Sequence, residues 1–235
     1  MGFNANSELM KDIEARKAIA AALDVSAIVE GAYGSEDIAV PAKTVFCEQN
    51  FYYEDIDGYE YNIEEAKKLV QSSGLEGKTL KLVYNSSRAN MEDCALVIQQ
   101  QLKEVGINVE ITGYETQGFF EKFFYTDAGD WDLGLNGYST NGDNQGDEYM
   151  FSKEGFLSKN LCSTDEIAKL WNEGDATIDT EKRAEIYADL QQQIKDAYTM
   201  VPISDCKFIL AVDKKLEAAM LLIWFLYLRI IQNFI

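Results

Sequence analysis

The sequence contains no histidine. This absence excludes Ser-His-Asp and Cys-His catalysis, and it excludes every metal site that depends on imidazole ligands. Basic residues are also scarce, with 21 lysines and arginines against 40 acidic residues and a formal net charge of −19. Nucleic acids and anionic membrane surfaces are therefore disfavoured as partners, because binding them requires cations that neutralise phosphates.

Cysteine and proline are rare too, with four cysteines and two prolines in 235 residues. No two cysteines form a Cys-x-x-Cys pair, so a structural zinc site or a thioredoxin-like site is disfavoured. We expect free thiols, although a disulfide stays open. The cysteines are Cys47, Cys94, Cys162 and Cys206. Residues 1–11 lack an apolar signal core, so we expect no export signal within this chain.

Hydrophobic residues make up 47% of the chain, which is enough for a folded core. An apolar stripe with helical spacing predicts a helix from Asp12 to Leu23, and Asp24 is placed to cap a second one. Asn62 opens a further helix, where Glu65 can complete a capping box and Gly74 can end the helix.

Two polar segments lie between the predicted elements. Cys47–Glu65 is acidic and rich in tyrosine but lacks the spacing of an EF-hand, so we interpret it as a solvated loop with packed tyrosines rather than a cation site. Gly137–Gly155 is predicted to be a long polar loop, and loops of this length are often functional.

The clearest unit is a strand, a helix and a second strand. Leu80–Tyr84 and Ile107–Thr112 alternate apolar and polar residues, whereas Met91–Val105 keeps helical spacing. This order predicts adjacent parallel strands with the helix packed on one face of the sheet. Ligands of such sheets bind beyond the carboxyl ends of the strands, which makes Asn85–Asn90 a candidate site loop.

The remaining patterns complete an α/β fold with a mixed sheet. Trp131–Asn136, Met200–Ser204 and Phe208–Val212 are predicted strands, and helices are expected around Ile167–Trp171 and Ile186–Ile194. Four phenylalanines suit one buried helix face, and they are Phe119, Phe120, Phe123 and Phe124.

Five segments in one order resemble the oligopeptide, dipeptide and nickel family (family 5) of solute-binding proteins that serve ABC transporters. They are ARKAIAAALDVSAIV at Ala15–Val29, YNIEEAKKLVQSSG at Tyr61–Gly74, IQQQLKEVGINVEI at Ile98–Ile111, WDLGLNGYS at Trp131–Ser139 and EKRAEIYADLQQQIKDAYTMVPI at Glu181–Ile203. Each is an ordinary amphipathic pattern alone, but their joint order covers roughly residues 2–212.

The resemblance implies a type II periplasmic-binding-protein-like clamp of two lobes. Residues 1–215 would form the C-terminal lobe, and the N-terminal lobe and the signal of the family would precede Met1. Ligand would be held between the lobes outside the cytoplasm and passed to an ABC permease in the membrane. The expected ligand is an oligopeptide or dipeptide, and neither a cofactor nor an enzymatic activity is expected.

A peptide ligand carries an ammonium group and a carboxylate, and each needs an opposite charge when it is buried. In peptide-binding relatives, an aspartate shortly after a Gly-Trp pair takes the ammonium. The resemblance therefore indicates Asp143 by chemistry or Asn141 by spacing, with Tyr138 as an aromatic wall. Arg88 is the candidate partner of the carboxylate, and Arg183 is expected on an exposed helix turn. A turn role for Asp143 and a surface role for Arg88 stay open.

Other readings remain. The chain could be a truncated or split-gene product that acts only as an interaction module, or its ligand could be a sugar or another small solute. A glycosidase is disfavoured because nothing in the sequence indicates that two acidic side chains converge in one pocket. Residues 216–235 are a tail of uncertain origin, which includes the apolar run Ala218–Leu228. Three origins stay open for this tail: a buried element, a marginal membrane anchor and sequence foreign to the fold. A membrane span is disfavoured because it needs about 20 apolar residues. We favour sequence foreign to the fold.

Overall fold

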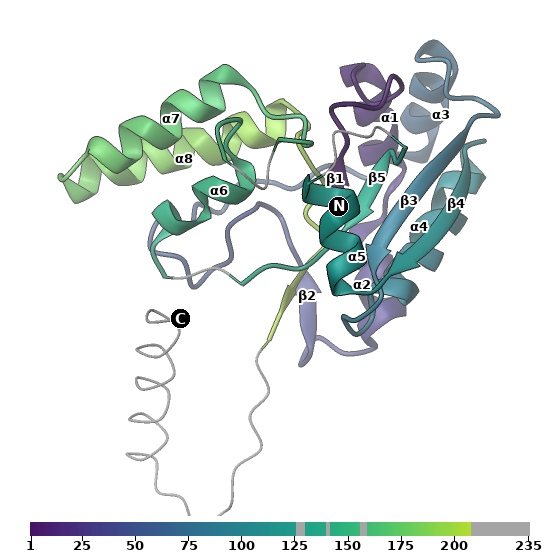
Figure 1. Cartoon of the computed structure of the whole chain (residues 1–235), viewed down its shortest axis with the longest axis horizontal. Coiled ribbons are helices and arrows are strands. Elements are labelled where there is room, and N and C mark those ends of the chain that lie inside the picture. The colour runs from purple at the N-terminus through teal and green to yellow at the C-terminus, as the bar shows by residue number, and fades with distance from the viewer. Residues whose placement is uncertain (126–129, 140–141, 156–158, 208–235) are drawn as a thin grey trace, which may run out of the picture.

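A computed structural model describes residues 1–125, 130–139, 142–155 and 159–207 (Figure 1). The predicted strand Phe208–Val212 and the tail 216–235 lie outside the described residues, as does Asn141. The described part combines an α/β unit with a helical unit that lies to one side of the sheet in Figure 1.

The main sheet has four strands in the order β1-β5-β3-β4. The central strand β3 (Thr79–Asn85) pairs in parallel with β4 (Asn108–Tyr114) and with β5 (Leu133–Leu135). The short edge strand β1 (Gly2–Phe3) runs antiparallel to β5. The prediction of two adjacent parallel strands is confirmed, and so is the mixed α/β sheet.

Helices cover both faces of this sheet. Leu80 and Leu82 of β3 share a core with Ile98 and Leu102 of α4 (Met91–Glu104), as the strand-helix-strand pattern predicts. Val83 points to the other face because side chains alternate along a strand, and it shares a second core with α5 (Thr116–Phe120). Figure 1 shows α5 in front of the strands.

Three further helices share the core of α4. α1 (Ile13–Ala22) and α2 (Val25–Tyr33) contact α4, and α3 (Ile63–Ser72) packs against α1. α2 and α3 start after the predicted caps, because the side chains of Asp24 and Asn62 each accept a main-chain N–H of the first turn. Asp12, predicted as the first residue of its helix, is the cap of α1 and accepts the N–H of Glu14.

Two details of the capping and packing predictions are wrong. Asn62 donates its main-chain N–H to the carbonyl of Ala21 at the end of α1, so Glu65 does not complete a capping box. The apolar stripe of this helix begins with Ile13 in the sequence, but Ile13 is 36% exposed, because the buried face of α1 begins at Ala15.

The helical unit contains α6 (Glu148–Phe151), α7 (Asp165–Ala176) and α8 (Thr180–Asp196). Trp171 of α7 and Tyr187 of α8 are fully buried and meet edge to face with ring centroids 5.6 Å apart. Figure 1 shows α7 and α8 side by side.

Part of the predicted loop Gly137–Gly155 is helical, because a 3₁₀ turn at Asn144–Asp147 leads directly into α6. Burial of Met150 and Phe151 accounts for this difference, since packing of these two side chains fixes the short helix.

The closing strand also differs from its prediction. β6 spans Ser204–Cys206 and pairs antiparallel with β2 (Ala39–Pro41) in a separate two-stranded sheet. Met200 makes only an isolated bridge with Gly2.

An aromatic core joins the sheet to the helical unit. Phe119 and Phe124 are fully buried and Phe123 is nearly so, whereas Phe120 is only half-buried. The chain continues from α5 as a π-helical turn, Glu121–Tyr125, which carries the last two rings. The Phe123 ring lies flat on the strand at Gly134, where an added Cβ would lie 2.0 Å from Cε2 of that ring. The buried helix face is therefore confirmed for three of the four phenylalanines.

The four cysteines are free thiols, and burial raises the pKa of Cys94 to about 11. Among the helices that the structure describes, none combines the length and the apolar character needed to cross a membrane.

Candidate functional site

The carboxyl edge of the sheet is organised by Asn85, the last residue of β3. Its side chain is buried, and its Oδ1 accepts hydrogen bonds from the main-chain N–H of Ser87 at 3.1 Å and from Oγ1 of Thr116 at 3.3 Å. Its Nδ2 donates to Oδ1 of Asn136 at 3.5 Å. Asn85 therefore ties together the ends of three parallel strands and fixes the loop in which the sequence places a ligand site.

Arg88 lies in this loop and is exposed. Its main-chain N–H donates to the carbonyl of Asn85 at 3.2 Å. Its guanidinium reaches across to the segment after β5, where Nη1 lies 3.3 Å from the position that a Cβ would take at Gly137. The fold thus brings Arg88, the predicted partner of the ligand carboxylate, against the start of the segment that leads to Asp143, the predicted partner of the ligand ammonium.

Tyr138 follows Gly137 and is held by the surrounding chain. Its hydroxyl donates to the carbonyl of Val45, and its ring meets Phe151 edge to face with centroids 5.0 Å apart. Burial raises the pKa of Tyr138 well above its ordinary value. The ring is half-buried, so the side that remains accessible is set by these contacts.

Asp143 is the predicted acid, and 45% of its side chain is exposed. Its Oδ1 accepts a hydrogen bond from Nη2 of Arg183 on α8 at 3.3 Å. The prediction that Arg183 lies on an exposed helix turn is wrong, because only 14% of its side chain is exposed.

Two stacked tyrosines explain the burial of Arg183. The guanidinium carbon lies 5.2 Å from the ring centroid of Tyr52 and 5.5 Å from that of Tyr187. The two rings stack on each other with centroids 5.1 Å apart. The spacing of Arg183 and Tyr187 on one helix was visible in the sequence, but the role of Tyr52 depends on a contact across the fold.

The 3₁₀ turn after Asp143 buries two polar side chains. Asn144 is 0% exposed; its Oδ1 accepts the main-chain N–H of Tyr52 at 3.2 Å, and its Nδ2 has no partner among the described residues. Asp147 is 2% exposed, and its Oδ2 likewise lacks a partner there. Burial, together with the charge of Asp143, raises the pKa of Asp147 to about 7. Sequence reasoning missed this carboxyl.

The acidic, tyrosine-rich segment packs along the same loop. Tyr52 stacks on Tyr187, and Tyr59 stacks on Tyr198 at 4.8 Å while its hydroxyl donates to the carbonyl of Lys195. The interpretation of this segment as a loop with packed tyrosines therefore agrees with the structure.

Phe51 lies in the same segment, and its main-chain N–H donates to the carbonyl of Gly142 at 2.8 Å. The segment therefore forms one wall of the region around Asp143.

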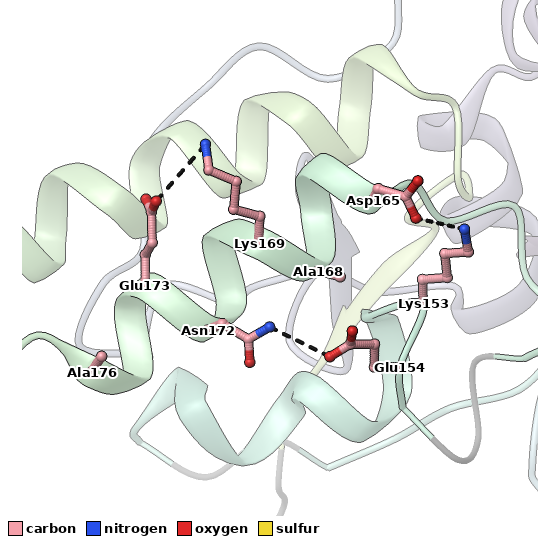
Figure 2. Close-up of a pocket in the computed structure, with 8 residues that line it drawn as sticks. All are labelled: Lys153, Glu154, Asp165, Ala168, Lys169, Asn172, Glu173 and Ala176. Carbon is pink, nitrogen blue, oxygen red and sulfur yellow. Dashed lines mark hydrogen bonds and ion pairs between the residues drawn. The ribbon is translucent and has the colours of Figure 1, made fainter.

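An open groove of about 720 Å³ lies beside α7 (Figure 2). Its charged side chains are exposed and largely pair with one another: Lys153 with Asp165 at 2.5 Å, and Lys169 with Glu173 at 3.8 Å. The lining is completed by Ala168 and Ala176 and by Asn172, which donates to Glu154. Since none of these groups is buried without a partner, the groove is a weaker candidate than the region around Asp143. No group of three or more potential metal ligands occurs in the part of the chain that the structure describes.

The comparisons with known proteins agree with the resemblance read from the sequence. Residues 1–155 match the family described as bacterial extracellular solute-binding proteins, family 5 Middle. The oligopeptide-binding protein AppA of Bacillus subtilis is 26% identical over 217 residues, which cover 83% of this chain and 39% of that protein.

Solved structures give the same result. AppA from Clostridium difficile is 34% identical with a TM-score of 0.82, and the match covers 88% of this chain and 43% of that one. The ABC transporter substrate-binding protein CtaP from Listeria monocytogenes is 29% identical with a TM-score of 0.82, covering 87% and 42%. The chain thus spans about two fifths of the length of these relatives.

Proposed function

Because this chain belongs to the bacterial extracellular solute-binding proteins of family 5, we propose that it is the ligand-contacting C-terminal lobe of a peptide receptor for an ABC transporter. The relatives named for oligopeptide and dipeptide binding support a peptide as the ligand. The receptor works outside the cytoplasm and hands its ligand to a membrane permease. Its task is binding, not catalysis.

The observation that carries this proposal is the position of Arg88 in the loop at the carboxyl edge of the sheet, against the start of the segment that leads to Asp143. The guanidinium of Arg88 lies against Gly137, and the half-exposed carboxylate of Asp143 lies at the other end of the same segment. A peptide that spans this edge finds an anion for its ammonium and a cation for its carboxylate. Tyr138 lies between Gly137 and Asp143 in the sequence and would supply an aromatic wall, and Asn141 belongs to the same segment.

The Asp143 carboxylate has to serve both Arg183 and the ligand. An ionised carboxylate has two oxygens and about four acceptor positions, so it accepts from a guanidinium and from an ammonium at once. Arg183 is held by two tyrosine rings, and it therefore fixes the orientation of Asp143 before the ligand arrives. Closure of a second lobe over the ligand would complete the site, and this lobe alone should bind weakly.

Calorimetric titration of short peptides into the complete receptor that contains this chain tests the proposal. Asp143→Ala should lower the affinity for peptides with a free ammonium by about 30-fold, since a charge-assisted contact that the bound ligand and the second lobe cover contributes about 2 kcal/mol. Peptides with an acetylated N-terminus should show little change. Asp165→Ala is the matched control, because Asp165 is also paired with a cation but lies in the groove on α7. Equal affinities of wild type and Asp143→Ala for free peptides would refute the ammonium site.

A neutral solute such as a sugar is the second candidate, and the Asp143–Arg183 ion pair favours it, because the pair already balances the charge of Asp143. Titration of neutral sugars into the same receptor decides between the two. Sugar binding that survives Asp143→Ala, without any peptide binding, would replace the peptide by a sugar.

A further inference from the structure

Phe51 is the most exposed of the phenylalanines that the structure describes. Its side chain is 70% exposed, whereas Phe3, Phe46, Phe119 and Phe151 are at most 1% exposed. Leaving a large aromatic ring in water forgoes roughly 1.5–3 kcal/mol of burial free energy. An exposed ring of this size next to a binding region therefore calls for an occupant that covers it.

The chain around Phe51 is anchored on both sides. Asn50 is buried, and its Oδ1 accepts the main-chain N–H of Cys47 at 2.9 Å. Tyr52 stacks on Tyr187 and donates its main-chain N–H to Asn144. Phe51 therefore sits between two fixed residues, and its exposure follows from a defined backbone position.

The ring itself rests on the loop that carries the candidate acid. Its Cζ and Cε1 lie 3.2 and 3.3 Å from the position that a Cβ would take at Gly142, and the Phe51 N–H bonds the carbonyl of that glycine. Glycine at position 142 thus allows the ring to lie directly on the main chain. The next residue is Asp143, so an exposed ring and a half-exposed carboxylate lie on neighbouring positions.

We propose that Phe51 is a specificity-determining residue that contacts the first side chain of the ligand and favours peptides whose N-terminal residue is apolar. This inference rests on the proposed function. In a peptide, the first Cβ is separated from the ammonium nitrogen by one carbon only, so an ammonium bound at Asp143 brings that side chain to its neighbours. The ring face also attracts the ammonium through its quadrupole.

The other candidate for covering the ring is the part of the receptor outside this chain, since the related proteins are longer than this chain. A ring covered by the second lobe would contribute to closure with every ligand equally. A ring that touches the first side chain would contribute according to the size of that side chain. The two occupants therefore differ in selectivity and not only in affinity.

The test uses the complete receptor and three tripeptides, Ala-Ala-Ala, Leu-Ala-Ala and Phe-Ala-Ala, in calorimetric titrations. Phe51→Ala should weaken binding of the leucine and phenylalanine peptides by about tenfold or more, because an apolar contact of one or more methylenes is lost. It should change Ala-Ala-Ala by less than about threefold, on the same reasoning. Phe51→Trp should preserve the preference. Ile178→Ala is the control, because Ile178 is 96% exposed in the turn between α7 and α8.

The outcomes separate this inference from the function on which it rests. If the wild-type receptor binds none of the peptides, the proposed function fails and the role of Phe51 falls with it. If the peptides bind but Phe51→Ala weakens all three by the same factor, or changes none, only the role of Phe51 is refuted. Thermal melting of each variant checks that it is folded. If Phe51→Ala does not fold, the comparison of Phe51→Trp with the wild type takes its place in the test.

Discussion

Replacement of Asp147 by asparagine should make the protein more stable at neutral and alkaline pH. Asp147 is 2% exposed, its Oδ2 lacks a partner among the described residues, and its pKa is raised from 3.8 to about 7 by burial and by Asp143. The unfolded chain loses this proton near pH 3.8, whereas the folded chain keeps it until about pH 7. The folded state thus gains from the neutral carboxyl at low pH, and this gain is lost as the pH rises from 3.8 to 7.

The size of the effect follows from the shift. A rise in the pKa of Asp147 from 3.8 to about 7 corresponds to roughly 4 kcal/mol, at 1.36 kcal/mol per pKa unit. This value is an upper bound, because the turn can relax around the charged carboxylate. A typical domain has about 5–15 kcal/mol of stability, so the effect is large enough to measure. Asp147→Asn keeps the shape of the side chain and removes the ionisation, so its gain should be roughly 2–4 kcal/mol at pH 8 and small at pH 4.

Urea unfolding of both proteins at several values between pH 4 and pH 8 provides the measurement. Many other carboxyl groups titrate at the acid end, but they are common to both proteins and cancel in the difference. Asp165→Asn is the control, because 89% of the Asp165 side chain is exposed and its neutralisation should give no such pH dependence. If the free energies of unfolding of wild type and Asp147→Asn differ by the same amount from pH 4 to pH 8, the carboxyl of Asp147 is not held neutral in the folded state.

Two further substitutions test how local structure supports the site. Asn62→Ala removes the 3.0 Å cap on the N–H of Glu65 and should lower the free energy of unfolding by about 1 kcal/mol in chemical denaturation. Gly134→Ala places a Cβ 2.0 Å from the Phe123 ring and should lower the free energy of unfolding by about 1–3 kcal/mol. Part of this loss should be recovered in the double variant Gly134→Ala, Phe123→Leu, because leucine is smaller than phenylalanine. A Gly134→Ala protein as stable as wild type would mean that the ring has room to move.

The parallel pairing of β3 with β4 could be predicted from the sequence because its pattern is local. Leu80 and Leu82 alternate with exposed residues, α4 follows with helical spacing, and a right-handed crossover leaves one arrangement for the second strand. The helix caps at Asp12, Asp24 and Asn62 were equally local, since each side chain bonds an N–H two or three residues ahead. Such features depend on neighbours in the chain and not on the remainder of the fold.

The environment of the candidate acid could not be predicted in the same way. Arg183 is buried by Tyr52, a residue far away in the sequence, and no pattern on α8 indicates that contact. The turn from Asn144 to Asp147 is polar, so it resembles a loop until Met150 and Phe151 are packed. The raised pKa of Asp147 is also a consequence of that packing, because the residue type alone favours a solvated carboxylate.

The pairing of Asp143 with Arg183 is compatible with a cationic ligand for two physical reasons. A guanidinium held against the rings of Tyr52 and Tyr187 keeps the carboxylate in one orientation, so less side-chain entropy is lost when a ligand binds. The charge balance is also incomplete, because Asp147 adds a second acid beside Asp143. Once Asp147 ionises, it adds a negative charge beside Asp143, and a ligand ammonium is a group that would compensate this charge. Ionisation of the buried carboxyl near neutral pH should therefore strengthen the attraction of this region for a cation, although Asp143 is the more exposed of the two acids.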